Sequence, residues 1–359
     1  MSRSSFLPVL MTIIAGLLLG SCSASRDLPE GQLMLNKVNV VADGRYRDVN
    51  PAQLKNYVRQ KGNSRWFSSL KIPLGVYAIA GKDSSKWINR TLRSIGEAPV
   101  IYDTIQARLS CENLQRALQN LGYLDSQVEL YTERKGKKLN AVYVLHPGIQ
   151  YFVRRVSYDI QDSLIARLLA NDVHQLKEGE KLNVDALNAE RMRITEKLQN
   201  NGYFKFHKEF INFMVDTLQS THKADVTLIL RPYRTSDILD TLHTRYTVRS
   251  IDFASGDPND SVIHLRKHVL KENTFIEESK PYSAADLQNT YNHFGRLGAV
   301  KYTNISFEQD PDSAHLDAHI QLQTNKPSTL SFQPEGTNTA GDLGAAASLT
   351  YENRNLFRG

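Results

Sequence analysis

The sequence lacks the short motifs that mark common enzyme chemistries. No His-Glu-x-x-His pair, Gly-x-Ser-x-Gly turn or phosphate-binding glycine loop occurs in its 359 residues. His264 and His268 stand four residues apart in a stretch where a helix is predicted, but no third metal ligand lies nearby in the sequence. We therefore expect no enzymatic activity, no metal and no cofactor.

Long hydrophobic runs are also lacking. The apolar run at 6–19 is shorter than the roughly 20 residues that a membrane-spanning helix needs. It follows Arg3 and leads to Leu19-Gly20-Ser21-Cys22, as in a secretion signal. This stretch resembles the bacterial lipobox. The resemblance implies cleavage before Cys22, acylation of that cysteine by chains such as palmitate, and a lipid anchor in the outer membrane. An ordinary signal peptide is the alternative.

Cysteine is scarce, and only Cys111 remains beside Cys22. With Cys22 modified, no intramolecular disulfide can form in an oxidising compartment. Cys111 lies at the expected start of a helix, with no histidine or lysine close by in sequence to activate its thiol. We predict a packed structural cysteine.

Charge is not concentrated. The formal net charge is +6, and the densest basic cluster, 134–138, falls between two predicted strands, where a solvated turn is expected. We expect no nucleic-acid partner for an exported chain, while anionic lipids and acidic polypeptides stay open as partners.

Three stretches share one pattern, which we call the glycine corner. A large apolar residue precedes a glycine by four positions, and an alternating run follows at Gly122, Gly202 and Gly298. Glycine ends helices because it adopts the left-handed conformation at almost no cost. The pattern predicts three copies of one unit. The strands expected after the corners are Leu124–Tyr131, Phe204–Val215 and Val300–Glu308.

Two further patterns recur. Tyr151-x-Val-Arg154 and Tyr246-x-Val-Arg249 open the second and third copies, and Asp162 and Asp260 are expected to cap the first helices of these copies. Second helices are expected to begin at a cap that is preceded by an apolar residue and followed by a leucine four positions later. These caps are Ser110, Asn183 and Ser283.

The order in each copy is β-α-α-β-β, which predicts an α+β fold of tandem repeats rather than a doubly wound sheet. An irregular insertion separates the two helices of the first copy. The expected parts are a signal peptide at 1–21, a lipidated linker at 22–32, repeat 1 at 33–148, repeat 2 at 149–233, a linker at 234–245, repeat 3 at 246–325 and a terminal segment at 326–359.

This order, the corner followed by an aromatic residue and the exported context resemble POTRA domains. With the lipobox and the segment 96–103, Gly-Glu-Ala-Pro-Val-Ile-Tyr-Asp, the chain resembles the Bacteroidetes lipoprotein branch of the BamA/TamA outer-membrane assembly superfamily. The resemblance covers nearly the whole chain beyond the signal.

The terminal segment changes character. Apolar and polar residues alternate along 345–352, as a lipid-facing strand requires. The sequence 353–359, Asn-Arg-Asn-Leu-Phe-Arg-Gly, resembles the end of the first barrel hairpin in this superfamily, with Arg358 inserted. The resemblance implies an incomplete antiparallel β-barrel of at most two strands. A truncated product, a fragment or a separately encoded remainder would each account for it.

By resemblance, we expect the repeats to bind unfolded outer-membrane proteins or assembly-machine subunits in the periplasm by adding a strand to an exposed sheet edge. A structural or interaction scaffold without insertase activity is the alternative. Ordinary sheet core is the other interpretation of the apolar residues on the expected edges. The candidate contacts are Leu124, Val128, Leu130, Phe204, Phe206, Phe210, Val300, Tyr302 and Ile305.

Overall fold

The computed structural model describes residues 28–356, except 45, 47, 48, 66–70, 81, 82, 84, 171, 219, 237, 238, 259, 311, 312, 340 and 341. The expected signal peptide, the acylation site Cys22 and the last three residues of the terminal motif lie outside the described residues.

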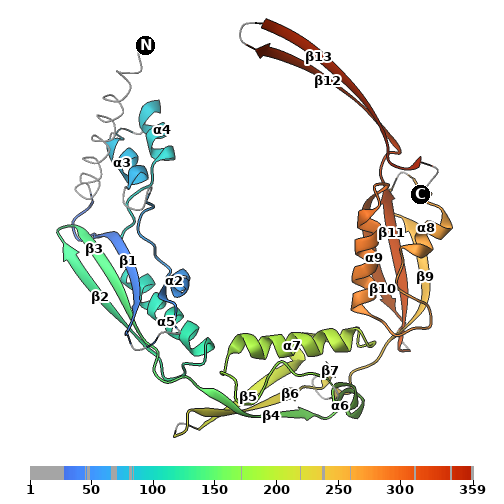
Figure 1. Ribbon diagram of the computed structural model, residues 1–359, viewed down its shortest axis with the longest axis horizontal. Helices are drawn as coiled ribbons and strands as arrows, with labels where there is room; N and C mark the ends of the chain where they lie inside the picture. Colours follow the sequence, from blue (N-terminus) through green and yellow to red (C-terminus); the bar gives the residue numbers. More distant parts are fainter. Residues whose placement is uncertain are drawn as a thin grey trace. The chain divides into compact units, whose positions relative to one another are not determined.

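Helices and strands follow one another in an order that recurs along the chain (Figure 1). The elements are β1 (Met34–Ala42), α2 (Pro51–Leu54), the 3-10 helix η1 (Lys55–Tyr57), α3 (Ile72–Ile79), α4 (Trp87–Ile95), α5 (Thr104–Asn120), β2 (Gln127–Lys135), β3 (Lys138–His146), β4 (Phe152–Ile160), α6 (Ser163–Leu169), α7 (Val184–Gln199), the 3-10 helix η2 (Lys208–Phe210), β5 (Ile211–Leu218), β6 (Lys223–Leu230), β7 (Tyr233–Ser236), β8 (Leu239–Thr241), β9 (Thr247–Ser255), α8 (Lys267–Glu272), α9 (Ala284–Arg296), β10 (Val300–Gln309), β11 (His315–Thr324), β12 (Ser328–Thr339) and β13 (Asp342–Asn353).

Three sheets have the same topology, with the last strand of each repeat in the centre. Their orders are β1-β3-β2, β4-β6-β5 and β9-β11-β10. In the first and third sheets the central strand pairs parallel with the first strand and antiparallel with the strand before it. The predicted α+β fold of tandem β-α-α-β-β repeats is confirmed. It is followed by a two-stranded antiparallel hairpin, β12–β13.

The chain divides into two compact units. The first comprises Met1–Arg155, Lys177–Ala186 and Asp216–Asp225, and the second comprises the rest. Strands β4, β5 and β6 each contribute residues to both units, so the two units do not coincide with the three repeats.

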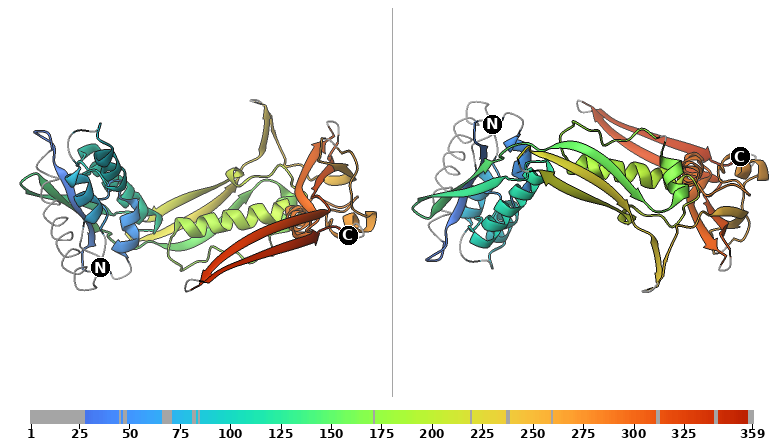
Figure 2. Two further views of the ribbon diagram at one scale, coloured as in Figure 1. Left: turned by 90° about the horizontal axis from the view of Figure 1, so that it is seen from above. Right: turned by 90° about the horizontal axis from the view of Figure 1, so that it is seen from below.

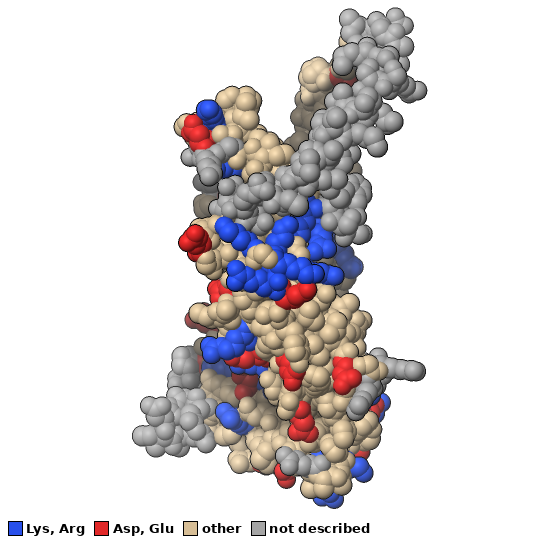
Figure 3. All heavy atoms as spheres, turned by 90° about the vertical axis from the view of Figure 1, so that its left-hand side faces the viewer, with Lys and Arg blue, Asp and Glu red and all other residues tan. Residues whose placement is uncertain are grey.

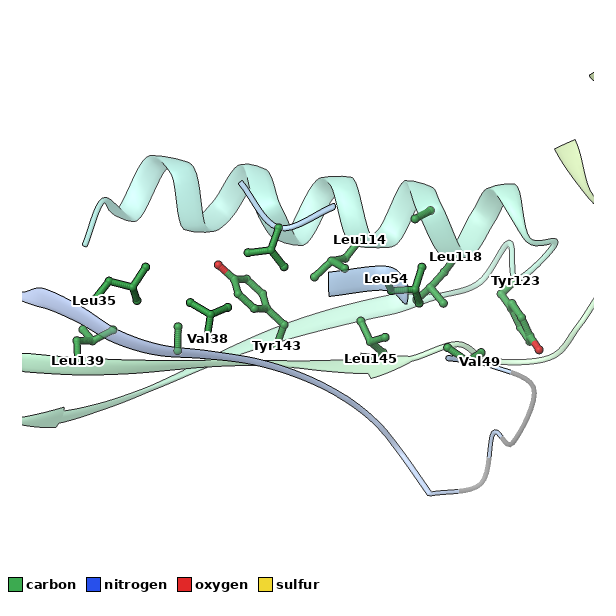
Figure 4. Close-up of a cluster of buried hydrophobic side chains, with 13 residues drawn as sticks. Leu35, Val38, Val49, Leu54, Leu114, Leu118, Tyr123, Leu139, Tyr143 and Leu145 are labelled. Atoms are coloured by element: carbon green, nitrogen blue, oxygen red, sulfur yellow. The ribbon is translucent and has the colours of Figure 1, made fainter. Parts of the chain in front are cut away.

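The core of repeat 1 lies between α5 and one face of its sheet (Figure 4). Leu114 and Leu118 of α5 are fully buried and belong to one cluster with Tyr143 and Leu145 of β3. Along β3 buried and half-buried residues alternate, because successive side chains of a strand point to opposite faces. Each large side chain buried in this way contributes roughly 1.5–3 kcal/mol.

The other repeats pack in the same way. Helix α7 lies along its sheet in the views of Figures 1 and 2, and its Ile194 and Leu198 are fully buried in a cluster that includes Leu228 of β6. In repeat 3, Phe294 of α9 packs in one cluster with Ile320 of β11.

The predicted start of the second helix in repeat 1 is wrong. Ser110 is not a cap: it lies fully buried inside α5, and Cys111 lies beside it in mid-helix. The cap is Asp103, whose carboxylate accepts hydrogen bonds from the backbone N–H groups of Ile105 and Gln106 at 2.7 and 3.2 Å. The cap therefore lies seven positions before the predicted one.

In all three repeats, the position on the second helix that Ser110 occupies in repeat 1 holds a buried polar side chain. Ser110, Glu190 and Thr290 are fully buried, one on each second helix. Each accepts a hydrogen bond from a backbone N–H of the segment that precedes the helix, at 3.1, 2.8 and 3.0 Å respectively. A buried polar group needs such a partner, and here it holds the segment between the two helices against the second.

The first helix of repeat 3 also departs from the prediction. Asp260 caps no helix: its carboxylate accepts from the N–H of Val262 and pairs with His264, and α8 begins only at Lys267. In repeat 2, Asp162 does cap α6, accepting from the N–H groups of Leu164 and Ile165. The irregular insertion of repeat 1 contains the helices α3 and α4.

Candidate functional site

The first two glycine corners have backbone angles that favour glycine. The φ angle is +90° at Gly122 and +100° at Gly202. A Cβ added at Gly122 would lie 2.0 Å from the carbonyl oxygen of Leu182, and one at Gly202 would lie 2.6 Å from Cγ of Arg245. Both glycines therefore combine a positive φ with a close approach of the chain that follows.

The third corner is built differently. Gly298 has no positive φ, and nothing lies within 4 Å of a Cβ built on it. Helix α9 ends at Arg296, and the cap residue Leu297 is extended. The left-handed conformation expected at Gly298 is therefore wrong. One turn at 298 and 299, closed by a hydrogen bond of 2.9 Å from the N–H of Val300 to the carbonyl of Leu297, leads straight into β10.

Each of the first two corners is joined to the next repeat by one backbone hydrogen bond, and a second bond continues the contact inside that repeat. The N–H of Tyr151 donates to the carbonyl of Gly122 at 3.0 Å, and the N–H of Leu182 donates to the carbonyl of Tyr151 at 2.9 Å. The same pair recurs one repeat later, from Tyr246 to Gly202 at 2.7 Å and from Tyr282 to Tyr246 at 3.0 Å. We call these arrangements the joints. The opening tyrosine of the recurring motif is therefore a joint residue.

The arginine of the same motif forms an ion pair with an aspartate on the neighbouring strand of its sheet. Arg154 of β4 pairs with Asp225 of β6, with Nε 2.7 Å from Oδ1. Arg249 of β9 pairs with Asp317 of β11 through two hydrogen bonds, and its Nη1 lies 2.7 Å from the carboxylate of Asp310. The guanidinium and the Ser250 hydroxyl hold the pKa of Asp317 at about 2.

A buried ionic cluster lies inside repeat 2. The carboxylate of Glu190 accepts hydrogen bonds from Arg193 at 2.7 and 2.9 Å, from the backbone N–H of Gln175 at 2.8 Å and from the hydroxyl of Tyr158 at 3.0 Å. Burial opposes its ionisation, but these hydrogen bonds outweigh burial and hold the pKa of Glu190 below its usual value. The cluster is satisfied internally, which indicates a structural role.

The strands that follow the corners lie at sheet edges. β2, β5 and β10 are the outer strands of their sheets. At the opposite edges, isolated bridges cover the start of each first strand, Met34 to Ile101, Phe152 to Lys181 and Thr247 to Pro281. No further strand or bridge flanks β2, β5 or β10 within the described ranges. These three outer strands are therefore paired on one side only in the described ranges.

Two of these strands begin later than predicted. β2 begins at Gln127 and β5 at Ile211, because each corner with a positive φ is followed by a turn. At the first corner, the N–H of Tyr123 donates to the carbonyl of Leu118, and the N–H of Ser126 donates to the carbonyl of Tyr123. β10 begins at Val300, as predicted.

Most of the predicted contact residues face the interior. Phe206, Val300 and Ile305 are buried in the cores of their repeats. Phe204 lies in the second joint, where its ring contacts those of Tyr246, Tyr282 and Phe307. Half-buried positions are occupied by the predicted contacts Leu124, Val128, Leu130 and Phe210.

Of the predicted contacts, only Tyr302 has an exposed side chain, and it lies on β10. Sequence reasoning missed Tyr131 of β2 and Met214 of β5, which are equally exposed large side chains on the other two edges. The alternation of each strand would have identified them once the strand boundaries were known.

The terminal hairpin carries a continuous apolar face. Leu330 pairs with Tyr351 and Phe332 pairs with Leu349 across β12 and β13, so these four side chains point to one side. All four are between 64% and 68% exposed. Figure 2 shows the two strands side by side. The motif after β13 contacts repeat 3, because the Asn355 amide donates to the carbonyl of His264 at 2.8 Å.

The described part of the chain holds no group of three histidine, cysteine or acidic residues that could bind a metal ion. It also holds no helix with both the length and the hydropathy needed to cross a bilayer.

Several solved structures resemble the chain. The Haemophilus influenzae BamA POTRA3–5 fragment is 15% identical, with a TM-score of 0.41, and the match covers 83% of this chain and 99% of that one. POTRA1–3 of Anabaena Omp85 is 10% identical, with a TM-score of 0.30 and coverages of 83% and 98%. CdiB of Acinetobacter baumannii is 10% identical, with a TM-score of 0.30 and coverages of 58% and 36%. No protein-family model and no curated protein matches the sequence. At these identities and scores, the likeness concerns the fold of the repeats alone.

Proposed function

We propose that this chain is the periplasmic POTRA module of an outer-membrane protein assembly or translocation factor of the BamA/TamA superfamily. In this proposal its repeats bind unfolded outer-membrane proteins or partner subunits by strand addition. It acts by binding, without enzymatic chemistry or a cofactor, and it is held at the outer membrane by an acylated Cys22. The proposed lipoprotein branch rests on the lipobox and the segment 96–103.

The observation that carries the proposal is the terminal hairpin. Its apolar face, centred on Phe332 and Leu349, is exposed, and its opposite face is polar, with Glu335 and Glu352. Four large apolar side chains on one face of an isolated hairpin suit contact with hydrocarbon. Since repeat 3 leads directly into this hairpin, the hairpin would place the repeats at a membrane surface.

The open edges supply the binding mode. A strand added to β2, β5 or β10 would use backbone hydrogen bonds, which require no particular client sequence. The three edges occupy the same place in three repeats, so this protein would offer three equivalent binding sites for an added strand.

A photo-crosslinking amino acid at Met214 tests the binding mode in cells. Met214 lies on the β5 edge and is 57% exposed, and Met192, on helix α7 of the same repeat, is a matched control at 64%. We expect outer-membrane proteins or partner subunits to be captured from position 214 but not from 192. Equal capture at both positions, or none at 214, would contradict strand addition and favour a scaffold without client contacts.

A further inference from the structure

The insertion of repeat 1, helices α3 and α4, packs against the segment that follows the expected anchor at Cys22. Leu74 of α3 is fully buried in a small cluster with Leu28 and Met34. Helix α4 returns beside α3, where Arg93 lies over the ring of Tyr77 at 5.9 Å. The insertion is thus a helical pair fixed to the first described residues of the chain.

Helix α4 turns its apolar side outward. Trp87, Ile88 and Ile95 are 69%, 52% and 68% exposed, whereas Leu92 and Arg93 are half-buried. Residues 87, 88, 91 and 95 share one face of a helix. A helix that packs its arginine and exposes its tryptophan and isoleucines has an apolar face without a partner in the described chain.

Basic residues lie on the insertion and beside it, and the Glu97 carboxylate, which binds Ser64, is an acidic group next to them. On α4 itself, Lys86 and Arg90 are exposed. At the base of α3, a hollow of about 420 Å³ beside β1 is lined by four basic residues and no carboxylate. Its basic residues are Lys37, Lys55, Lys61 and Arg65. Figure 3 shows lysine and arginine gathered in a band on this side of the molecule.

Lys71 connects the hollow to the insertion. It is the residue before α3, and its ammonium donates to the backbone and side-chain oxygens of Asn36, which lines the hollow, at 2.8 and 2.9 Å. Burial and the nearby charges of Arg65 and Lys138 lower the pKa of Lys71 to about 8. The crowding of cations here favours an anionic ligand.

The expected anchor places this surface at a membrane. Six peptide units connect Cys22 to Leu28, and six residues span at most about 20 Å when fully extended. If Cys22 is acylated, Leu28 lies within that distance of the lipid headgroups, and Leu74 of α3 packs in the same cluster as Leu28.

We propose that the α3–α4 insertion is a second membrane attachment, in which the exposed face of α4 lies in the interface of an anionic bilayer while the basic hollow faces lipid phosphates. Tryptophan and isoleucine on one side of a helix with lysine and arginine at its border suit this interface. This inference rests on the proposed anchor at Cys22, which brings the insertion to the membrane.

Tryptophan fluorescence tests the proposal in the full chain. The chain has two tryptophans, so Trp66→Phe leaves Trp87 as the sole reporter. The purified protein is reconstituted into vesicles that contain phosphatidylglycerol and lipids brominated near the headgroup. We expect a blue-shifted spectrum and strong quenching of Trp87. The control carries Trp66→Phe, Trp87→Phe and Tyr131→Trp, which moves the reporter to an exposed position on β2 of the same repeat.

Quenching of Trp87 no greater than that of the control would overturn the proposal. A blue shift that depends on protein concentration in detergent, without quenching in vesicles, would overturn it in favour of a second copy of this chain on α4. The double variant Lys86→Gln with Arg90→Gln tests the role of charge. It should lower the quenching of Trp87 in anionic vesicles and leave the quenching in neutral vesicles unchanged. An equal effect in both kinds of vesicle would overturn the preference for an anionic surface. The intact mass reports on the anchor separately, because an unacylated Cys22 refutes the anchor while Trp87 still decides the membrane surface.

Discussion

Replacing Gly122 with alanine should weaken the first joint more than the same change weakens any other corner. The new Cβ would lie 2.0 Å from the backbone oxygen of Leu182 and 2.5 Å from Nε2 of Gln150. A backbone oxygen cannot rotate away as a side chain can, so the segment before α7 must move. That movement strains the hydrogen bond from the N–H of Leu182 to Tyr151.

The magnitude follows from two costs. A non-glycine residue at a left-handed φ costs roughly 1–2 kcal/mol, and overpacking costs roughly 1–3 kcal/mol, so Gly122→Ala should cost about 2–5 kcal/mol. At Gly202 the nearest atom belongs to the flexible side chain of Arg245, and the cost should be about 1–3 kcal/mol. At Gly298 there is neither a positive φ nor a clash, so alanine should change stability by no more than about 0.5 kcal/mol.

Hydrogen exchange measured on peptides of each repeat suits this comparison, because a chain of several units does not unfold in one two-state step. A loss of 2 kcal/mol or more should speed exchange around Tyr151 and the start of α7 by roughly thirtyfold or more, with repeat 3 unchanged. Gly298→Ala is the matched control. If Gly122→Ala exchanged like wild type, the joint would not depend on the close approach, and this account of the corner would be wrong.

Three further predictions concern titratable groups. The pKa of Glu190 lies below its usual 4.5, so the ionised carboxylate stabilises the fold above that pH, and this stabilisation is lost as the pH falls through the lowered pKa. In a plot of urea midpoint against pH, Glu190→Gln should therefore reduce the fall of the midpoint at acid pH. A fall as steep as that of the wild type would contradict this. Arg249→Ala should raise the pKa of Asp317 from about 2 toward 3.8, as followed by NMR titration. Burial and Glu112 raise the pKa of Cys111, so its alkylation at pH 8 should be slower than that of a free thiol until the chain is unfolded.

Local signals in the sequence predicted the repeat order, because caps, glycines and alternating runs each depend on few neighbours. They did not fix the start of α5. Leu109-Ser110 followed by Leu114 has the spacing of a capped helix start, but so does Tyr102-Asp103 with Ala107, seven residues earlier. The choice between them depends on whether Ser110 is needed as a buried acceptor for Arg59, which is a tertiary contact.

The candidate contacts were predicted less well for the same kind of reason. Alternation says that two faces differ but not which face a neighbouring repeat covers. Phe204 was assigned to an edge, yet it packs against Tyr282, which lies some 80 residues further along the chain. The exposed edge residues Tyr131 and Met214 each follow a half-buried neighbour, and they can be identified only once the strand boundaries are known.

The joints explain why the motif Tyr-x-Val-Arg recurs although the connections before it differ. β3 ends at His146, close to Tyr151, whereas β6 ends at Leu230 and the hairpin β7–β8 intervenes before Tyr246. Nevertheless Tyr246 donates to Gly202 as Tyr151 donates to Gly122. The corner carbonyl and the opening tyrosine therefore set the joint, and the length of the linker does not. A joint formed by backbone atoms requires only a glycine that lets the two segments approach and a residue whose N–H can donate to the carbonyl of that glycine. Repeat 3, which contains the third corner, is followed by the hairpin β12–β13 instead of another repeat. There the side chain of Asn325 donates to Gly298 at 2.9 Å, and no close approach demands a positive φ.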